Sequence, residues 1–266
     1  MATQAETTTV GGDNLMSSCE HIDTTVDQHI LLIGINRPKK KNALTPEMYK
    51  AIGEALVDAD TNPTIKAVLV HGTTGAFSAG SDLSGFDKRD PNQPPPAGQL
   101  VAVLHEFRKP VVAAVSGLAV GIGTTILLHC DLVYASHDTR FRMPFISLGL
   151  CPEAGSSLLL PATVGLRQAS EVLLLGDFFS TAKAIELGIV NDSIDTDKVM
   201  NHALEKTRQL AEKPSQAMIE SKRLLKQAYH QALGNRMNEE IKLFNELLST
   251  SESIEARAKQ KNARKV

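Results

Sequence analysis

Two turns rich in small residues, each placed after an apolar β-type run, constrain the fold of this chain most strongly. The first turn spans residues 77–83 (FSAGSDL) and follows the run 65–71, whereas the second spans 120–125 (VGIGTT) and follows the run 111–115. Small residues allow a sharp turn and a close approach of the backbone to a ligand. Two such turns can direct their N–H groups at one point, which is the arrangement that holds a developing oxyanion.

One carboxylate, Glu153, stands among small and apolar residues in the segment 149–155 (GLCPEAG). A carboxylate with little water around it has a raised pKa, which suits it to take and return a proton. An acid just before a helix start can instead interact with the helix dipole and act as a cap. The residues alone leave both interpretations open, and the catalytic one predicts an anion hole served by a lone acid/base.

The order of the predicted elements indicates an α/β fold, because strands and helices alternate over about 190 residues. Thr45 is the expected N-cap of a helix that has Pro46 in its first position and runs to about residue 58. Ser180 is expected to cap a later helix that Gly188 ends, after which residues 189–190 resume β structure. The other predicted elements are strands at 22–26, 30–35, 65–71, 111–115 and 131–135, and helices at 99–107 and from about residue 123.

Composition and the pattern of apolar residues divide the chain into three regions. Residues 1–19 are rich in Thr, Ser and Gly and are predicted to be disordered, and 20–196 form the core. Residues 197–266 are expected to be a helical region whose thin apolar stripe needs a partner surface. The segment 85–98 contains several prolines and is predicted to be an irregular loop with polyproline character.

Composition excludes several classes of protein. A chain of 266 residues that is 42% hydrophobic and 22% charged is typical of a globular protein with one sizeable core. Its net charge of −2 gives no reason to expect nucleic acid or a membrane as a partner, and no apolar run approaches the roughly 18 residues of a membrane span. Three cysteines without paired spacing and an N-terminus without signal character predict a cytoplasmic location.

Other chemistries find little support. Gly121 and Gly123 begin a dinucleotide-type fingerprint, but Ile126 stands where its third glycine belongs. No serine lies in a G-x-S-x-G elbow, and the histidines share no metal-ligand spacing, so neither a serine hydrolase nor a metal site is expected. The basic run 39–41 either binds a phosphate or is a solvated loop.

Four ordered motifs together resemble the crotonase (enoyl-CoA hydratase/isomerase) superfamily. They are Arg37-Pro38 with Asn42-Ala43-Leu44, the 77–83 turn, the stretch 109–131, and the stretch 180–191. The resemblance implies a spiral of ββα turns with a C-terminal helical trimerisation region, and assembly as a homotrimer or a dimer of trimers. It also implies acyl-CoA thioester substrates and no separate cofactor, because coenzyme A is part of the substrate.

The resemblance also implies roles for single residues. The backbone N–H groups of Ser81 and Ile122 would form the oxyanion hole. From its position in the chain, the loop 87–98 is expected to border the acyl pocket. The residues expected to bind substrate are Lys41, Ala43, Ser78, Ala79, Gly80, Asp82, Leu83 and Gly121.

The acids distinguish the reactions within this superfamily. Thr125 and Phe145 stand where hydratases carry their two glutamates, whereas Glu153 stands where peroxisomal-type Δ3,Δ2-enoyl-CoA isomerases carry theirs. The resemblance therefore implies conversion of 3-enoyl-CoA to trans-2-enoyl-CoA by a 1,3 proton shift, as in fatty-acid β-oxidation. The alternatives are a weak hydratase, a thioester hydrolase, or a non-catalytic binding module with the same fold.

Overall fold

A mostly parallel sheet organises the chain in this computed structural model, which describes residues 13–15, 18–73, 75–84 and 95–263. Among these residues seven strands pair in the order β1-β2-β3-β4-β5-β7-β10. The first three run antiparallel and the later ones parallel. The strands are β1 (Asp13–Leu15), β2 (Ile22–Asp27), β3 (Ile30–Ile35), β4 (Ala67–His71), β5 (Val111–Val115), β7 (Leu132–Ser136) and β10 (Asp192–Ile194).

Neighbouring parallel strands β4 and β5 explain why the two small-residue turns meet. Val70 pairs with Ala113 and His71 with Ala114, so both strands end on the same edge of the sheet. The segments that follow the two strands, and the turns that they contain, therefore start from this edge. A second, three-stranded sheet lies beyond it and consists of β6 (Leu118–Val120), β8 (Arg140–Arg142) and β9 (Phe179–Ser180).

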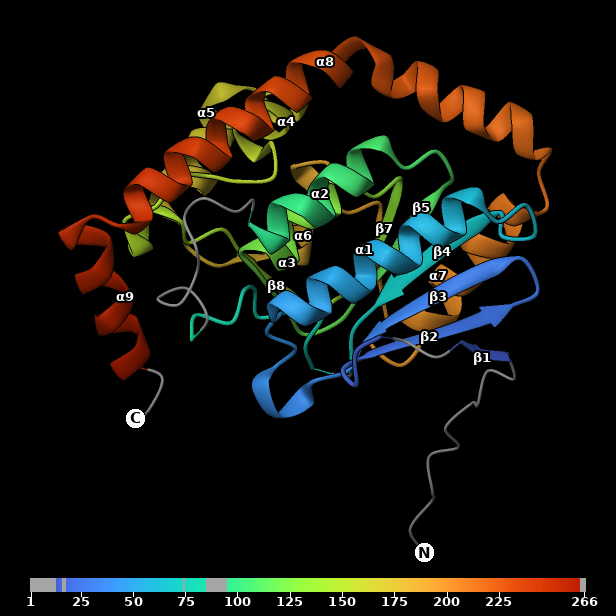
Figure 1. The fold of residues 1–266 in the computed structure, drawn as a ribbon, viewed down its shortest axis with the longest axis horizontal. Helices are drawn as coiled ribbons and strands as arrows, with labels where there is room; N and C mark the ends of the chain where they lie inside the picture. Colours follow the sequence, from blue (N-terminus) through green and yellow to red (C-terminus); the bar gives the residue numbers. More distant parts are fainter. Residues whose placement is uncertain (1–12, 16–17, 74, 85–94, 264–266) are drawn as a thin grey trace, which may run out of the picture.

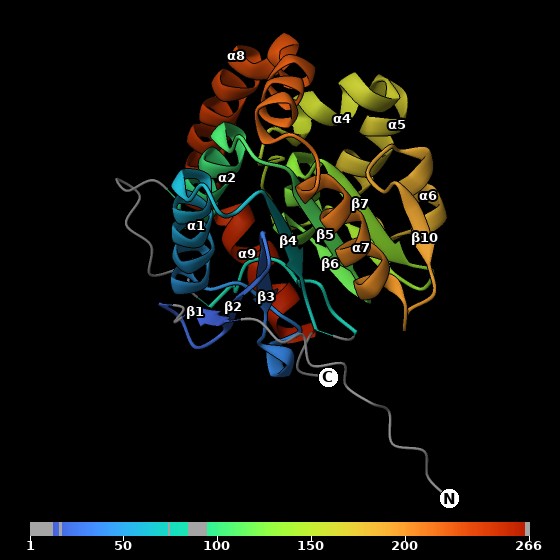
Figure 2. The same cartoon turned by 90° about the vertical axis from the view of Figure 1, so that its right-hand side faces the viewer.

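Helices cover both faces of the main sheet (Figures 1 and 2). On one face lie α1 (Pro46–Thr61) and α2 (Pro96–Glu106), which pack against each other over the larger core cluster. On the other face α7 (Val199–Ala211) packs Ala203 and Leu204 against Leu32 and Leu69 of the strands. Strand residues on both faces are buried, which explains the nearly continuous apolar runs in their sequences.

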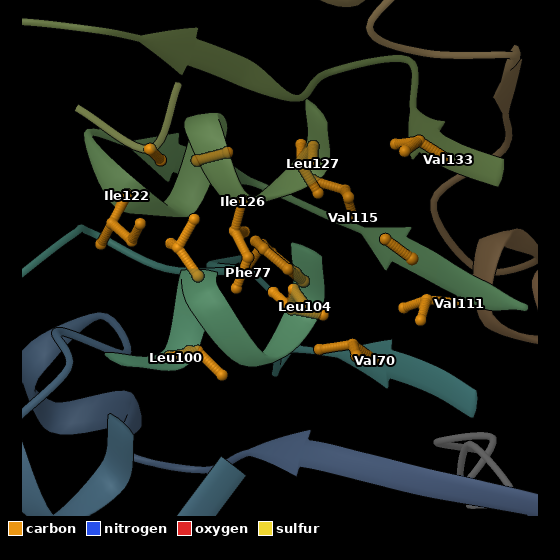
Figure 3. Close-up of a cluster of buried hydrophobic side chains, with 14 of the residues drawn as sticks. Val70, Phe77, Leu100, Leu104, Val111, Val115, Ile122, Ile126, Leu127 and Val133 are labelled. Atoms are coloured by element: carbon orange, nitrogen blue, oxygen red, sulfur yellow. The ribbon is translucent and has the colours of Figure 1, made fainter. Parts of the chain in front are cut away.

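The larger core reaches the base of the two turns. Figure 3 shows Leu104 of α2, Phe77 of the first turn and Ile126, which follows the second turn, pointing toward one another. Phe77 is 1% exposed. The apolar residues within and beside the turns therefore anchor them, which leaves their small residues free to face a ligand.

Three helices form the C-terminal region: α7, α8 (Ser215–Leu248) and α9 (Ser251–Ala263). Figure 1 shows α8 running along one edge of the molecule, past α4 (Ser156–Val164) and α2. Two lysines fasten α8 to Asp131: Lys222 Nζ lies 2.7 Å and Lys226 Nζ 3.2 Å from its carboxylate. Leu225 of α8 is 82% exposed, as expected for a helix that needs a further partner, and trimeric assembly remains a prediction.

Most predicted elements are confirmed, with Thr45 accepting from the Met48 amide and Ser180 from the Lys183 amide as the expected caps. The short strand β1 corrects part of the disorder prediction for 1–19, because it pairs with β2. The helix expected from residue 123 is only one turn, α3 (Ile122–Thr125), followed by 3₁₀ structure over Ile126–His129.

The β structure predicted at 189–190 is wrong. The amides of Ile189 and Val190 donate to the Ala184 carbonyl and so close the end of α6 (Thr181–Glu186), and pairing begins only at Asn191 and β10. Most of the predicted 85–98 loop lies outside the described residues, and α2 already begins at Pro96. No described helix is both long enough and apolar enough to cross a membrane.

Candidate active site

A cavity of about 660 Å³ opens at the edge of the sheet where the two turns lie. Its wall combines the start of α1, both turns, the segment that carries Glu153, and the inner side of α8. Apolar side chains such as Phe145, Leu148 and Met237 line much of it. A mostly apolar cavity with a few convergent polar groups is the usual form of a small-molecule site.

The two turns are paired to each other by backbone hydrogen bonds. The Ser78 amide donates to Leu118 O at 3.0 Å, and the Val120 amide donates to Ser78 O at 2.9 Å, which makes a parallel bridge between Ser78 and Ala119. Ser81 and Ile122 each lie three residues after the bridged residue of their own chain. The parallel register therefore brings these two residues to the same level beside the cavity, which both of them line.

The N–H groups of Ser81 and Ile122 are available to a ligand. In the part of the chain that the structure describes, no carbonyl or side chain accepts a hydrogen bond from either group. Ile122 opens helix α3, where the first N–H groups have no partner within the helix. Two free backbone donors on one cavity wall can bind the oxygen of a polarised carbonyl.

Gly80 allows the turns to approach this closely. Its φ is +86°, and a Cβ at this position would lie 2.7 Å from Val120 O. The buried Ser78 hydroxyl accepts from the Gly80 amide and donates to Asn42 O, and Asn42 donates to Ala76 O. Ser78 and Asn42 therefore support the first turn from behind.

Glu153 enters the cavity from the third segment. Its carboxyl group accepts a short hydrogen bond from the hydroxyl of Thr125, the last residue of the second turn. Burial raises the pKa of Glu153 to about 8, with the Thr125 hydrogen bond working against this rise and the charge of Glu240 adding to it. The carboxyl group is therefore poised to exchange a proton near neutral pH.

The alternative capping role of Glu153 is not what the structure shows. Helix α4 begins at Ser156, and its N-cap is Gly155, which has no side chain to accept from the amides of the first turn. The carboxylate that accepts from the amides of Gly155 and Ser157 is Glu240 of α8, and Glu153 points to Thr125 instead.

The other pocket acids differ from Glu153 in their surroundings. Asp82 forms a 2.7 Å ion pair with Arg37, whose guanidinium also donates to Ala43 O. Although burial works in the opposite direction, hydrogen bonds from Ser84 and Arg37 hold the pKa of Asp82 at about 2. Glu47 lies in the first turn of α1, where the Thr45 hydroxyl lowers its pKa. Among the described acids that line the cavity, Glu153 alone is neither exposed nor paired with a cation, because Glu47 is exposed and Asp82 is paired with Arg37.

The structure separates the predicted substrate-binding residues into two groups. Those that line the cavity, besides Ser81, Ile122 and Glu153, are Ala79, Gly80, Asp82, Leu83 and Gly121. Lys41, Ala43 and Ser78 do not line it. Lys41 O accepts from the Ala79 amide, so this residue holds the turn through its backbone. Substrate binding by these residues stays a prediction, as does phosphate binding by the exposed Lys39 and Lys40.

Sequence reasoning missed Tyr49 as a site residue. This buried side chain lines the cavity, and its hydroxyl lies 2.7 Å from Ser81 Oγ, so it fixes the side chain beside one oxyanion donor. Burial raises its pKa further above the ordinary value, which keeps the phenol neutral. Tyr49 lies in the first turn of a helix that begins at Pro46, and nothing in that sequence predicts a contact with Ser81.

The structure brings together one group of side chains that the histidine spacing did not predict. Ligand atoms of His105, Glu106 and His230 lie within 4.8 Å of one another, away from the cavity wall. The two imidazole rings are tilted against each other, with centroids 4.2 Å apart and 36° between their planes. His129 has another role, because its Nε2 lies 2.7 Å from Ala154 O.

Comparison with known proteins identifies the family and agrees with this fold. A family model described as Enoyl-CoA hydratase/isomerase matches residues 25–265. The chain belongs to this family, the crotonase superfamily, as the sequence motifs indicated. The structure of Pseudomonas aeruginosa OdaA, 40% identical, matches with a TM-score of 0.87 over 91% of this chain and 99% of that one. The expected crotonase fold with a helical C-terminal region is thereby confirmed.

Named relatives in the family differ in their reactions. The chain is 33% identical to 2,3-dehydroadipyl-CoA hydratase of Escherichia coli over 232 aligned residues. The alignment covers 86% of this chain and 90% of that protein. It is 34% identical over 237 residues to Enoyl-CoA delta isomerase 2 of Rattus norvegicus, covering 86% of this chain and 60% of that protein. Identity at this level therefore does not choose between hydration and isomerisation.

Proposed function

We propose that this protein is an acyl-CoA double-bond isomerase, which converts 3-enoyl-CoA to trans-2-enoyl-CoA. The observation that carries the proposal is the setting of Glu153: a half-buried carboxyl group whose pKa is raised to about 8, with Thr125 rather than a second cavity acid beside it. Isomerisation moves one proton between two carbons of one substrate, and one base is sufficient for this. Hydration needs a group to activate water and another to deliver a proton.

The proposed reaction begins when the thioester carbonyl oxygen binds to the N–H groups of Ser81 and Ile122. The Glu153 carboxylate removes a proton from C2, and the C–H electron pair forms a dienolate whose charge rests largely on the thioester oxygen. The two N–H groups stabilise that charge. The protonated Glu153 then gives the same proton to C4, and the double bond comes to rest between C2 and C3. Atoms and charge balance without a metal or redox cofactor.

A hydratase is the second candidate, because a relative at 33% identity carries that name. The two positions at which hydratases carry glutamates hold Thr125 and Phe145, and Phe145 is a buried part of the cavity wall. An apolar wall at that position offers no group to orient a water molecule. This contact pattern favours isomerisation over hydration.

Parallel assays of 3-enoyl-CoA and 2-enoyl-CoA test the proposal. We expect 3-enoyl-CoA thioesters to be converted to the conjugated product, while hydration of 2-enoyl-CoA is slower by at least about 10²-fold, the smallest usual contribution of one general acid or base. A panel of chain lengths would define the preferred acyl group. Faster hydration than isomerisation would refute the isomerase assignment, and bound acyl-CoA without turnover would indicate a binding module.

The pH dependence of the reaction follows from the pKa of Glu153. A base must be deprotonated to act, so kcat/KM, which reports the free enzyme, should rise with pH and level off above about pH 8. Thr125→Val removes the hydrogen bond that lowers this pKa, so the rising limb should move to higher pH. Steady-state kinetics from pH 5 to 10 would measure both. A rising limb near pH 4.5 would contradict a buried base.

A further inference from the structure

Glu240 is a buried acid that belongs to no part of the cavity wall. It lies on α8, is 5% exposed, and reaches a turn more than 80 residues earlier in the chain. Its Oε2 accepts from the Gly155 amide at 2.6 Å. Its Oε1 accepts from the Ser157 amide at 3.1 Å and from the Ser157 hydroxyl at 2.6 Å. These amides open α4, so Glu240 supplies the cap that the segment itself lacks.

The turn that Glu240 holds is conformationally demanding. Ala154 and Gly155 both have positive φ, +58° and +71°. At Ala154 this left-handed conformation is disfavoured, because it brings the Cβ close to the following carbonyl oxygen. Such conformations persist only where surrounding contacts fix them. Here the contacts are His129 on the Ala154 carbonyl and Glu240 on the amides of Gly155 and Ser157.

The same turn directs Glu153, the residue that immediately precedes it. The Glu153 carbonyl accepts from the Ser156 amide and hydroxyl, so its backbone is part of the hydrogen-bonded unit that Glu240 closes. A change in this unit would move the Glu153 carboxyl relative to Thr125 and the cavity. Displacements of about 1 Å in a reacting group reduce rates by about 10²-fold.

Charge provides a second connection between the two acids. Beyond the larger effect of burial, the negative charge of Glu240 raises the pKa of Glu153. The other groups that face this pair are Arg236, which donates to Ser157 Oγ at 3.2 Å, Cys151, whose thiol faces Glu240 O, and Tyr49 beside Glu153. Cys151 and Tyr49 are neutral at the pH of interest, since burial raises the pKa of both.

We propose that Glu240 is a positioning residue for Glu153, holding the 153–157 turn that directs this acid into the cavity while its negative charge acts on the Glu153 carboxyl group. The inference rests on the proposed role of Glu153 as the base. Glu240 touches no substrate in this arrangement and acts only through the turn and its charge.

Two matched substitutions on α8 test this inference. Glu240→Gln keeps the side-chain shape but removes the charge and one acceptor. We expect kcat to fall about 10- to 100-fold with KM within about twofold, and the rising limb of kcat/KM to move to lower pH. Glu239→Gln makes the same change at the adjacent residue, which is 73% exposed and pairs with Arg236, and should alter neither. An unchanged kcat in Glu240→Gln, or a lower kcat without movement of the limb, would overturn the inference.

A measurement independent of turnover separates this inference from the proposed function. The Glu153 carboxyl can be titrated by NMR in the full chain with ¹³C-labelled glutamate, using Glu153→Gln to assign its signal. A lower pKa of Glu153 in Glu240→Gln supports the positioning role even where the wild type fails to isomerise 3-enoyl-CoA. An unchanged pKa counts against it.

If Glu240→Gln does not fold, Ser157→Ala provides the second variant, because it removes one of the three hydrogen bonds and leaves the Glu240 charge in place. Its kcat should fall several-fold, while the rising limb of its kcat/KM against pH stays where it is in the wild type. An unchanged kcat would overturn the inference.

Discussion

Glu153→Gln should lower kcat for 3-enoyl-CoA isomerisation by at least about 10³-fold, within the usual range for loss of a general acid/base. Glutamine can still accept the Thr125 hydrogen bond, but it cannot remove a proton from C2 or return one to C4. In the described part of the chain, the other carboxylates that line the cavity are either exposed, as Glu47 is, or paired with a cation, as Asp82 is, so no neighbour can replace Glu153. The absorbance of the conjugated thioester product measures this loss directly.

The same variant should remain folded and bind acyl-CoA with wild-type affinity, as measured by calorimetry. Its stability has a definite pH dependence. Because the folded-state pKa of Glu153 is raised from 4.5 to about 8, the wild type is stabilised by this group below pH 4.5 and loses that stability as the pH rises to about 8. Glu153→Gln lacks this loss. The amount by which its thermal midpoint exceeds that of the wild type should therefore grow between pH 5 and pH 8. Retained turnover or a constant difference in midpoint would contradict the buried-base assignment.

Gly80→Ala should reduce kcat by about 10²–10³-fold, the usual effect of losing one oxyanion donor. The added methyl group would lie 2.7 Å from Val120 O, so the two turns would have to separate. Separation moves the Ser81 N–H away from the Ile122 N–H, and the two could no longer bind one oxygen. Kinetics with 3-enoyl-CoA, together with the affinity for a saturated acyl-CoA, would show a loss concentrated in kcat.

Gly165→Ala is a suitable control for Gly80→Ala. Gly165 also has a positive φ, +79°, but nothing lies within 4 Å of the position that its Cβ would occupy, and it does not line the cavity. This variant should lower the thermal midpoint through backbone strain and leave kcat unchanged. Equal losses of kcat in the two variants would show that strain, and not separation of the turns, explains the effect.

The features that the sequence predicted well are those with a local cause. The strands β2, β3, β5 and β7 begin and end within one residue of their predicted ranges. Thr45 and Ser180 act as helix caps because their side chains bond to amides three residues later. The short α3 was harder to foresee. Its apolar continuation, 126–129, has a helical composition, but it tightens into 3₁₀ structure as it leads into β7.

The features that the sequence missed depend on contacts between distant segments. Nothing in the α8 sequence distinguishes Glu240 from its neighbour Glu239, yet one is 5% exposed and caps a distant helix while the side chain of the other is 73% exposed. Tyr49 and its contact with Ser81 join α1 to the first turn in the same way. Such partners are set by packing, which no local pattern encodes.

The sequence by itself determined the family, the two glycine-bearing turns and the isolated acid, because each is a property of neighbouring residues and their spacing. Only the tertiary structure decided that Ser81 and Ile122 lie at one level, since the parallel register of Ser78 with Ala119 joins segments about 40 residues apart. It also decided that Glu153 serves the cavity rather than capping α4, because α8 brings Glu240 to the helix start and burial sets the proton affinity of Glu153.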